Sequence, residues 1–384
     1  MSRLKQFLLT SLLHQQRKAK KSGGFTLIEL LVAIILTVLI ITPLMTLVLS
    51  MMDTDRKEEA KATTETEIQA ALNYIADDLQ QAVYIYDATA LKTNSVPSAT
   101  NAAASGIQDQ IPPVKPVNDC TVTTECVPVL VFWKRKYLDR KDDVKDTVTN
   151  SYVNIGTDIT DSIEGSDRYV YSLVAYYLIK DNSTTWQGKA RIARFEIRDG
   201  ISKTDSSGNV TVLLNPSQGF KRFNTVTSDG SLSLRMNRWV SGTYDAAQSA
   251  VTTLIDYVDD TTLSSTDIPD QTIRDQFSPP ENDLGEYSTT CSKDRTGTDK
   301  SGNLTSSRVP PSPPTELDTG SFYACVNPIN AQGQSVAQIY IRGNALRRLP
   351  EYSQVAVARP NQYNINYFPI ASVRVAVIGV LGEN

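Results

Sequence analysis

Two glycines and one carboxylate near the start of the chain have the types and spacing for chemistry. Gly23 and Gly24 follow a basic segment and directly precede Phe25, where a long apolar run begins. A protease that cut after these small residues would remove the basic segment and leave the apolar run attached to the rest of the chain. Glu29 is the only ionisable side chain in residues 25–52. We therefore expect a processing site at the glycines and a specific role for Glu29.

Histidine chemistry is excluded from the chain beyond the glycines, because the single histidine, His14, lies in residues 1–24. Ser-His-Asp and Cys-His nucleophile systems and histidine metal sites therefore cannot form there. Carboxylates alone can support catalysis, as in glycosidases, but no pattern picks out a pair among the 42 acidic residues. We expect no catalytic residues, no cofactor and no enzymatic activity.

The four cysteines, Cys120, Cys126, Cys291 and Cys325, all follow the apolar run. An even number in an exported segment indicates disulfides, and three pairings are possible. We favour Cys120 with Cys126, which are close in sequence, and Cys291 with Cys325, which would join a long loop to a strand. Free buried thiols are the alternative. A zinc site is disfavoured because neither pair has the short Cys-x2-4-Cys spacing of structural sites.

The element that must position Glu29 is the apolar run itself. Its 28 residues, at about 1.5 Å of helix each, exceed the ~30 Å hydrocarbon core of a membrane. The run is too long for the apolar region of a secretory signal, and no small-residue cleavage site follows it. Pro43 removes one intrahelical hydrogen bond, so we expect a kink or local melting near Thr42. An ordinary membrane-helix proline is the alternative.

The basic segment sets the expected orientation of this helix. Residues 1–24 contain six Lys and Arg residues and no acidic residue. By the positive-inside rule they stay in the cytoplasm, and the chain after Met52 is exported. Any cut after Gly24 would therefore lie on the cytoplasmic side of the membrane.

Residues 24–29, Gly-Phe-Thr-Leu-Ile-Glu, resemble the class III signal of type IV prepilins and type II secretion pseudopilins. The resemblance covers about the first sixty residues. It implies that a prepilin peptidase cuts the Gly24–Phe25 bond and that the new N-terminus is methylated. It also implies two further partners, an inner-membrane assembly platform and other pilins or pseudopilins in a filament.

Glu29 gains a candidate partner from this resemblance. An ionisable group in hydrocarbon costs roughly 2.5 kcal/mol or more, so such residues usually face a partner or a functional site. The resemblance implies that Glu29 pairs with the Phe25 amine of a neighbouring subunit and fixes the axial register. A protonated glutamate at the lipid interface is the alternative.

Residues 53–87 are expected to extend the helix beyond the membrane, to about residue 86. Residues 53–67 contain no apolar side chain larger than Ala and carry opposite charges at helical spacing, which indicates a solvated stalk. Apolar residues then return at spacings of three and four, at Ile68, Leu72, Ile75, Leu79 and Val83. This pattern predicts an amphipathic helix that packs on the sheet of the head.

The remaining residues, 88–384, form the predicted head, one α+β domain with an antiparallel sheet and large loop insertions. Runs rich in Val, Ile, Tyr and Phe predict strands at residues 127–133, 169–180, 189–198, 322–326, 335–341, 354–358 and 372–380. The second and third of these runs predict a hairpin. We expect a short helix at residues 245–259 and long loops at residues 88–126 and 260–319.

Two polar segments, residues 204–209 and 298–303, share the pattern Thr-Asp-x-Ser-Gly-Asn. Asp and Asn beside Gly favour surface turns. Calcium binding is the alternative, because oxygen-rich loops bind calcium in several pilins. Neither segment has the spaced carboxylates and terminal Glu of an EF-hand loop, and we expect no metal site.

The charge balance argues against nucleic-acid binding. The chain has 38 Lys and Arg against 42 Asp and Glu, and loss of residues 1–24 removes six basic residues and no acidic one. The 360 residues that follow Gly24 therefore carry a formal charge of −10. Phosphate neutralisation needs clustered Lys and Arg, although a local basic patch on the head is compatible with this balance.

Taken together, these features predict a non-enzymatic minor pseudopilin. It would cross the inner membrane once, with its N-terminus cytoplasmic and its head periplasmic, and then enter a pseudopilus or pilus. The large head favours a minor subunit, because bulky loops are hard to repeat along a packed filament. Residues 68–86 are similar to cyanobacterial pseudopilins for hormogonium polysaccharide secretion, particularly the C-type member. That similarity implies a polysaccharide cargo used in gliding motility.

Three other functions stay open at this point. The hairpin expected at residues 169–198 also resembles one in the large minor pseudopilins called J, which serve type II protein secretion. The head could instead be an adhesion or ligand-binding module carried at a pilus tip. An anchored enzyme is the third alternative.

Overall fold

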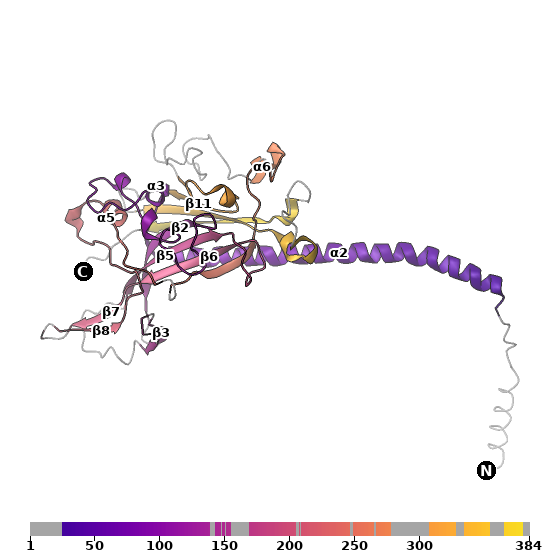
Figure 1. The fold of residues 1–384 in the computed structure, drawn as a ribbon, viewed down its shortest axis with the longest axis horizontal. Coiled ribbons are helices and arrows are strands. Elements are labelled where there is room, and N and C mark those ends of the chain that lie inside the picture. Colours follow the sequence, from indigo (N-terminus) through magenta and orange to yellow (C-terminus); the bar gives the residue numbers. More distant parts are fainter. Residues whose placement is uncertain are drawn as a thin grey trace, which may run out of the picture. The chain divides into compact units, whose positions relative to one another are not determined.

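The computed structural model describes residues 25–138, 143–146, 148–149, 151–154, 169–204, 207, 209–245, 249–264, 266–277, 307–327, 334–353 and 365–378. The chain divides into two compact units, Met1–Arg56 and Lys57–Asn384. Helix α2 (Leu27–Gln80) contributes its first half to one unit and its second half to the other. All the described strands belong to the second unit, the head (Figure 1).

Helix α2 contains 54 residues. Its first half is an apolar run of Leu, Ile and Val, and its second half is rich in Glu, Lys and Ala, which are strong helix formers. It ends at Gln80, so the expectation of a helix to about residue 86 is wrong at its end. Residues Ala82–Ile85 form strand β1 instead, and all four of its side chains are buried. Val83, Tyr84 and Ile85 are β-branched or aromatic, and pairing with a neighbouring strand stabilises the extended form.

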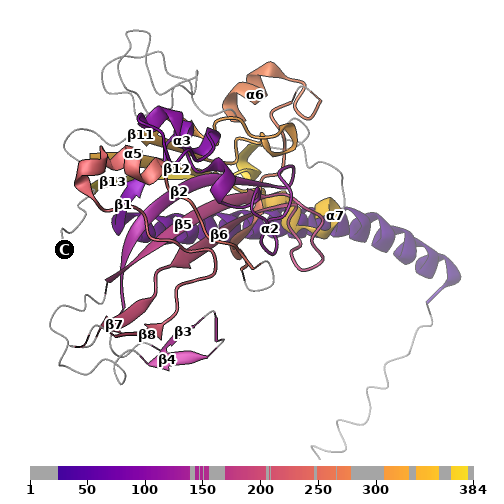
Figure 2. The same cartoon turned by 60° about the vertical axis from the view of Figure 1, so that its left-hand side comes forward.

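The first sheet has five antiparallel strands in the order β1-β2-β5-β6-β9. Its other members are β2 (Cys126–Tyr137), β5 (Tyr169–Ile179), β6 (Ala190–Arg198) and β9 (Thr252–Val258). The expected hairpin is confirmed, since β5 pairs with β6. The head half of α2 packs on this sheet (Figure 2), and the large helix side chains in the shared core are Ile68, Leu72, Ile75 and Leu79. The predicted α+β class, a long apolar N-terminal helix on an antiparallel sheet, is therefore confirmed.

A second antiparallel sheet has the order β10-β11-β12-β13. Its strands are β10 (Ser307–Val309), β11 (Phe322–Asn327), β12 (Gln334–Arg342) and β13 (Ile370–Ile378). Strands β10 and β11 contact β2, while β12 and β13 contact β1, so the two sheets share one core. The strand expected at residues 354–358, and the last two residues of the one expected at 372–380, lie outside the described residues.

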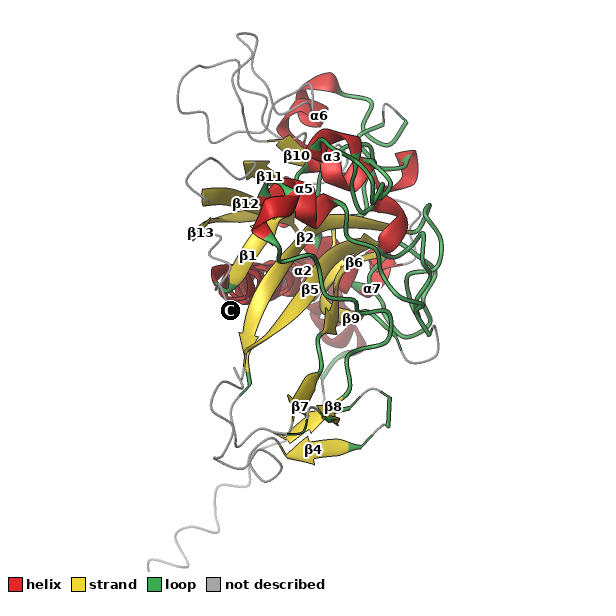
Figure 3. Cartoon of the chain, turned by 90° about the vertical axis from the view of Figure 1, so that its left-hand side faces the viewer, coloured by secondary structure: helices red, strands yellow, loops and turns green. Residues whose placement is uncertain are grey.

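Two small hairpins lie together at one end of the head (Figures 2 and 3). They pair β3 (Asp143–Lys145) with β4 (Tyr152–Asn154), and β7 (Ile201–Thr204) with β8 (Val210–Leu214). The carboxylate of Asp146 joins them. Its Oδ1 accepts hydrogen bonds from the Val148 and Thr149 N–H groups at 2.8 and 2.9 Å, and its Oδ2 accepts from the Asn215 N–H at 2.8 Å.

The polar segment at residues 204–209 connects β7 to β8, the place where a turn is expected. The similar segment at residues 298–303 lies outside the described residues.

The connections between strands carry short helices. The α-helices are α3 (Ala88–Lys92), α5 (Leu232–Asn237), α6 (Gln271–Phe277) and α7 (Pro350–Ser353). The single 3-10 turns are η2 (Ala102–Ala104), η3 (Gln108–Gln110), η4 (Thr227–Asp229), η5 (Thr315–Leu317), η6 (Ala345–Arg348) and η7 (Ile365–Tyr367). Within the described residues, the regions expected as long loops therefore contain short helices, and the second also contains strand β10.

The helix expected at residues 245–259 is wrong, because strand β9 occupies residues 252–258. Its apolar residues do recur at helical spacing, but Thr252, Thr253, Ile255 and Val258 are all β-branched, which disfavours helix and favours strand. Pairing with β6 places Val258 opposite Ala190. A partner about sixty residues away in sequence thus decides the conformation of this segment.

One predicted disulfide is confirmed. Cys120 and Cys126 are bonded, with their Cα atoms 5.5 Å apart. Cys325, on β11, is also disulfide-bonded. Cys291, its expected partner, lies outside the described residues, so the pairing of Cys291 with Cys325 stays a prediction.

Candidate functional site

The N-terminus of α2 is capped by a reciprocal pair of hydrogen bonds between Thr26 and Glu29. The Glu29 N–H donates to Thr26 Oγ1 at 3.3 Å, and the Thr26 N–H donates to Glu29 Oε2 at 3.0 Å. The Thr26 hydroxyl also donates to the same carboxylate oxygen at 2.9 Å. This is a capping box, in which two side chains satisfy N–H groups that a helix end leaves without partners. Glu29 is thus occupied within its own chain.

Phe25 and Glu29 lie at the same end of this helix, and the Phe25 side chain is 85% exposed. Gly23 and Gly24, the other residues of the expected processing site, lie outside the described residues. The structure therefore places Phe25, the first residue after the expected cut, at the same helix end as Glu29, the carboxylate expected to pair with a Phe25 amine.

The first half of α2 is long and apolar enough to cross a membrane. Its apolar side chains are exposed throughout, from Leu27 to Met52. Its hydroxyls bond inside the helix: Thr37 donates to the Ala33 carbonyl and Thr42 to the Val38 carbonyl, both at 2.7 Å. A continuous apolar surface with its polar groups satisfied needs lipid or like helices around it.

Pro43 lies inside α2, and the helix is continuous through it. Local melting near Thr42 is therefore absent in the isolated chain. The Thr46 hydroxyl donates to the Pro43 carbonyl at 2.8 Å. A kink at Pro43, or melting on filament assembly, stays a prediction.

Asp78 fastens the head half of α2 to the first sheet. Its Oδ1 accepts a hydrogen bond from Lys134 Nζ at 2.7 Å. Its Oδ2 accepts from the Tyr176 hydroxyl at 2.6 Å and from Arg194 Nε at 2.7 Å. Burial favours a higher pKa for Asp78, but Arg194, Lys134 and Tyr176 outweigh it and hold the pKa below its usual value. Glu196 completes the cluster, 2.8 Å from Arg194.

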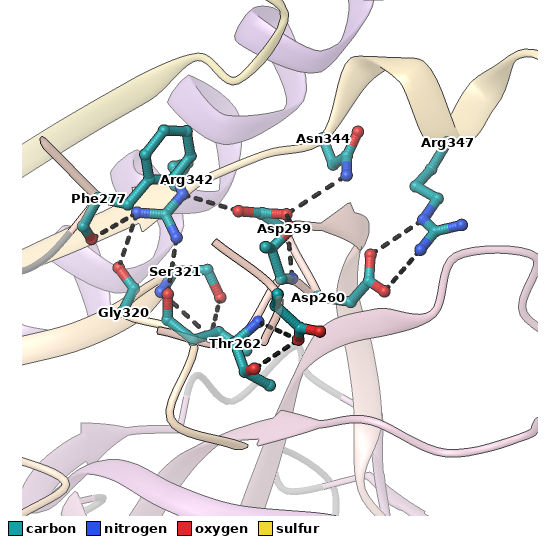
Figure 4. Close-up of polar contacts among 12 residues, drawn as sticks. Asp259, Asp260, Thr262, Phe277, Gly320, Ser321, Arg342, Asn344 and Arg347 are labelled. Carbon is teal, nitrogen blue, oxygen red and sulfur yellow. Dashed lines mark hydrogen bonds and ion pairs between the residues drawn. The ribbon is translucent and has the colours of Figure 1, made fainter. Parts of the chain in front are cut away.

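A second buried cluster joins the end of β9 to the end of β12 (Figure 4). Asp259 Oδ2 accepts a hydrogen bond from Arg342 Nε at 2.9 Å, and both side chains are almost fully buried. The other Arg342 nitrogens donate to the carbonyls of Phe277 and Thr319, at 2.8 and 2.6 Å. Burial raises the pKa of Asp259, and the guanidinium opposes that rise.

The neighbouring carboxylate, Asp260, is paired just as closely. Arg347 donates to both of its oxygens, Nε to Oδ1 at 3.0 Å and a terminal nitrogen to Oδ2 at 2.7 Å. Because each acid in this cluster is held by its own arginine, the cluster is suited to joining β9, β12 and η6.

Sequence reasoning did not single out these charged residues. Asp78 offered a signal, because it lies between Ile75 and Leu79 on the apolar face of the helix. Asp259 and Asp260 offered none beyond their types, because their partners lie more than eighty residues away. Within the described ranges, no group of three His, Cys, Asp or Glu side chains is placed to hold a metal ion.

Comparison with families of known proteins matches residues 19–45 to the prokaryotic N-terminal methylation motif. The match includes Gly24, Phe25, Glu29 and Pro43. Comparisons with characterised proteins and with solved structures give no significant match.

The motif defines a type IV pilin-like class III signal, and it supports a pilin-like or pseudopilin-like subunit. Proteins with this signal are structural rather than enzymatic. The signal implies processing by a prepilin peptidase and assembly with other pilins. With the membrane-length apolar helix, it also indicates membrane anchoring and a place in a pilus.

Proposed function

We propose that the chain is a minor pseudopilin, processed at Gly24–Phe25 and then moved from the inner membrane into a filament. The observation that carries this proposal is the matched signal at the start of an exposed apolar helix, in a chain that also has a large head. One apolar surface serves both states, since it is soluble first in lipid and later among like helices. The head is periplasmic in this proposal, and residues 1–24 are cytoplasmic.

Glu29 is the residue that sets the register in this proposal. Cleavage creates the Phe25 amine, and a neighbouring subunit's Glu29 then pairs with it. Before assembly the carboxylate is held by Thr26, so its desolvation in the membrane is partly offset by the capping box. In the filament, the incoming ammonium adds a charge-assisted hydrogen bond to that carboxylate.

Glu29→Gln tests this role, because it keeps the size of the side chain and removes its charge. We expect leader removal and membrane insertion to persist, while incorporation into the filament falls at least tenfold, by about 1.4 kcal/mol or more. Glu59→Gln, on the exposed face of the same helix, is the matched control and should assemble normally. Normal assembly of Glu29→Gln would exclude the proposed role. A variant that is no longer cleaved would assign Glu29 to peptidase recognition instead.

For the cargo, we propose a polysaccharide used in gliding motility, supported by the likeness of residues 68–86 to pseudopilins of that class. The second candidate is a J-like subunit of type II protein secretion, favoured by the Tyr-rich hairpin of β5 and β6. Carbohydrate and protein in the medium of a strain that lacks the chain, and of the complemented strain, separate the two. Loss of carbohydrate alone supports the first cargo, and loss of protein alone supports the second.

A further inference from the structure

A hollow of about 480 Å³ opens in the head between two walls. One wall is the turn between β5 and β6, residues 181–189. The other is formed by Arg347, Arg348 and Pro350, where η6 meets α7. The volume falls in the range of small-molecule sites, roughly 300–1,000 Å³.

The turn that forms the first wall is held in one conformation. Asp181 accepts from two nitrogens of the buried Arg191, at 2.5 and 2.7 Å, and the Trp186 N–H donates to Ser183 Oγ at 3.3 Å. The Gly188 N–H donates to Asp256 at 3.0 Å, and a Cβ at residue 188 would lie only 2.1 Å from that carboxylate. The turn therefore packs closely on β9 at Gly188.

Tyr257 ties the two walls together. Its hydroxyl donates to Gln187 Oε1 at 3.0 Å on the first wall. The guanidinium of Arg348, on the second wall, lies 4.3 Å from the centre of its ring. Because the walls are fixed to each other, the hollow exists before any ligand arrives, and less ordering is needed on binding.

The charges around the hollow are largely neutralised by protein partners. Arg347 is paired with Asp260, Arg348 with Glu67, and Asp181 with Arg191. Lys189 is the lining cation that makes no ion pair within the described part of the chain. An anion would therefore find one available cation and two arginines already engaged, which favours an uncharged ligand.

Several polar groups on the turn have no hydrogen bond to the described chain. They are the Asn182 amide, the Thr184 hydroxyl, the Trp186 indole N–H and the NH2 group of Gln187. Trp186 is 36% exposed, whereas Trp133 and Trp239 are buried. The hollow thus offers donors and acceptors together with one partly exposed indole.

We infer that this hollow binds an uncharged saccharide unit. Sugar hydroxyls both donate and accept, which matches the amides and the hydroxyl on the turn. The C–H face of a sugar ring packs on an exposed indole. A peptide fits less well, because β5 and β6 are both internal strands and present no free edge for strand addition. This inference does not depend on the proposed filament role.

The test uses the full chain in a detergent without a sugar headgroup. Maltotriose, cellotriose and triacetylchitotriose are titrated by calorimetry up to about 10 mM, which detects weak sites. At least one is expected to bind, and Trp186→Ala should weaken that binding by about tenfold or more. Thr184→Val should weaken it less, because it removes one hydrogen bond and keeps the indole. Tyr152→Ala, at another exposed aromatic residue, is the matched control and should bind like the parent.

Three results would overturn the inference: no binding of any of the three sugars, equal binding by the Trp186→Ala variant with its circular dichroism unchanged, or displacement of the sugar by inorganic phosphate. The last result would mark an anion site built on Lys189 and the arginines. Glu29→Gln should leave sugar binding unchanged, and Trp186→Ala should leave filament incorporation unchanged. The failure of one proposal is therefore distinguishable from the failure of the other.

Discussion

At the scale of single residues, Asp146 joins two hairpins with one carboxylate. Burial favours a higher pKa, but backbone N–H groups of Thr149, Asn215 and Val148 outweigh it and lower the pKa of Asp146 to about 2. The unfolded value is about 3.9. Because the folded pKa is the lower one, this stabilisation is complete above about pH 4 and is lost as the pH falls toward 2.

Asp146→Asn should therefore destabilise the head at neutral pH, by about 1–3 kcal/mol, because an NH2 group replaces one accepting oxygen. The difference from the parent should shrink as the pH falls from 4 to 2. Urea unfolding at several pH values, followed by tryptophan fluorescence, measures both effects. A difference that stays constant across this range would show that ionisation of Asp146 does not stabilise the fold.

Glu29 shows which part of a site the sequence alone reveals. Its charge inside an apolar run marked it as a functional residue, and that role stays a prediction. Its partner within the chain was not predicted, although the pattern Thr26-Leu-Ile-Glu29 is a capping-box signature that could have indicated it. The neighbouring-subunit partner involves a second copy, and its assignment stays a proposal.

At the scale of elements, Asp78 is the polar anchor in an otherwise apolar contact between α2 and the first sheet. The side chains of Lys134 and Asp78 are 5% and 9% exposed. Removing one partner of such a buried pair leaves the other charge unpaired in a low-dielectric site, which costs about 3–5 kcal/mol. Glu196 also lies near Lys134, at 3.7 Å. It would still neutralise part of the Lys134 charge after Asp78 is replaced.

We therefore expect Asp78→Asn to destabilise the head by an amount near the lower end of that range. Asp77→Asn is the matched control, because Asp77 is the adjacent residue and faces solvent. Guanidinium unfolding of the full chain in detergent compares the two variants. Equal midpoints would mean that apolar packing alone holds the helix on the sheet.

The elements that were predictable are those with a strong local signal. The apolar run, the amphipathic face from Ile68 to Leu79, and the long Val- and Tyr-rich strands β2, β5 and β12 all carry a period or composition that favours one conformation. The small hairpins β3–β4 and β7–β8 carry too few residues for such a pattern. Strands β1 and β9 are stabilised by partner strands distant in sequence, so their local periodicity wrongly predicted a helix for both segments.

At the scale of the whole molecule, the chain combines an apolar helix that needs lipid or like helices with a head that has its own buried core. The two buried charge clusters lie inside the head. Neither depends on residues 25–52, so the head can keep one structure while the surroundings of the helix change from lipid to filament. The proposed assembly requires a change at the N-terminal end, where cleavage creates a charge that the unprocessed chain lacks.

Gly24→Leu tests that requirement, because a bulky residue before the expected cut should block entry to the peptidase site. We expect residues 1–24 to stay attached, which mass spectrometry detects directly. Membrane insertion should persist, since residues 25–52 are unchanged. Without the Phe25 amine, Glu29 of a neighbouring subunit has no ammonium to bind, so filament incorporation should fall as far as in Glu29→Gln.

Gly24→Ala is the small-residue control and should be cleaved. Normal-length mature protein from Gly24→Leu would contradict processing at this bond, and normal assembly of the uncleaved variant would show that the amine is not needed.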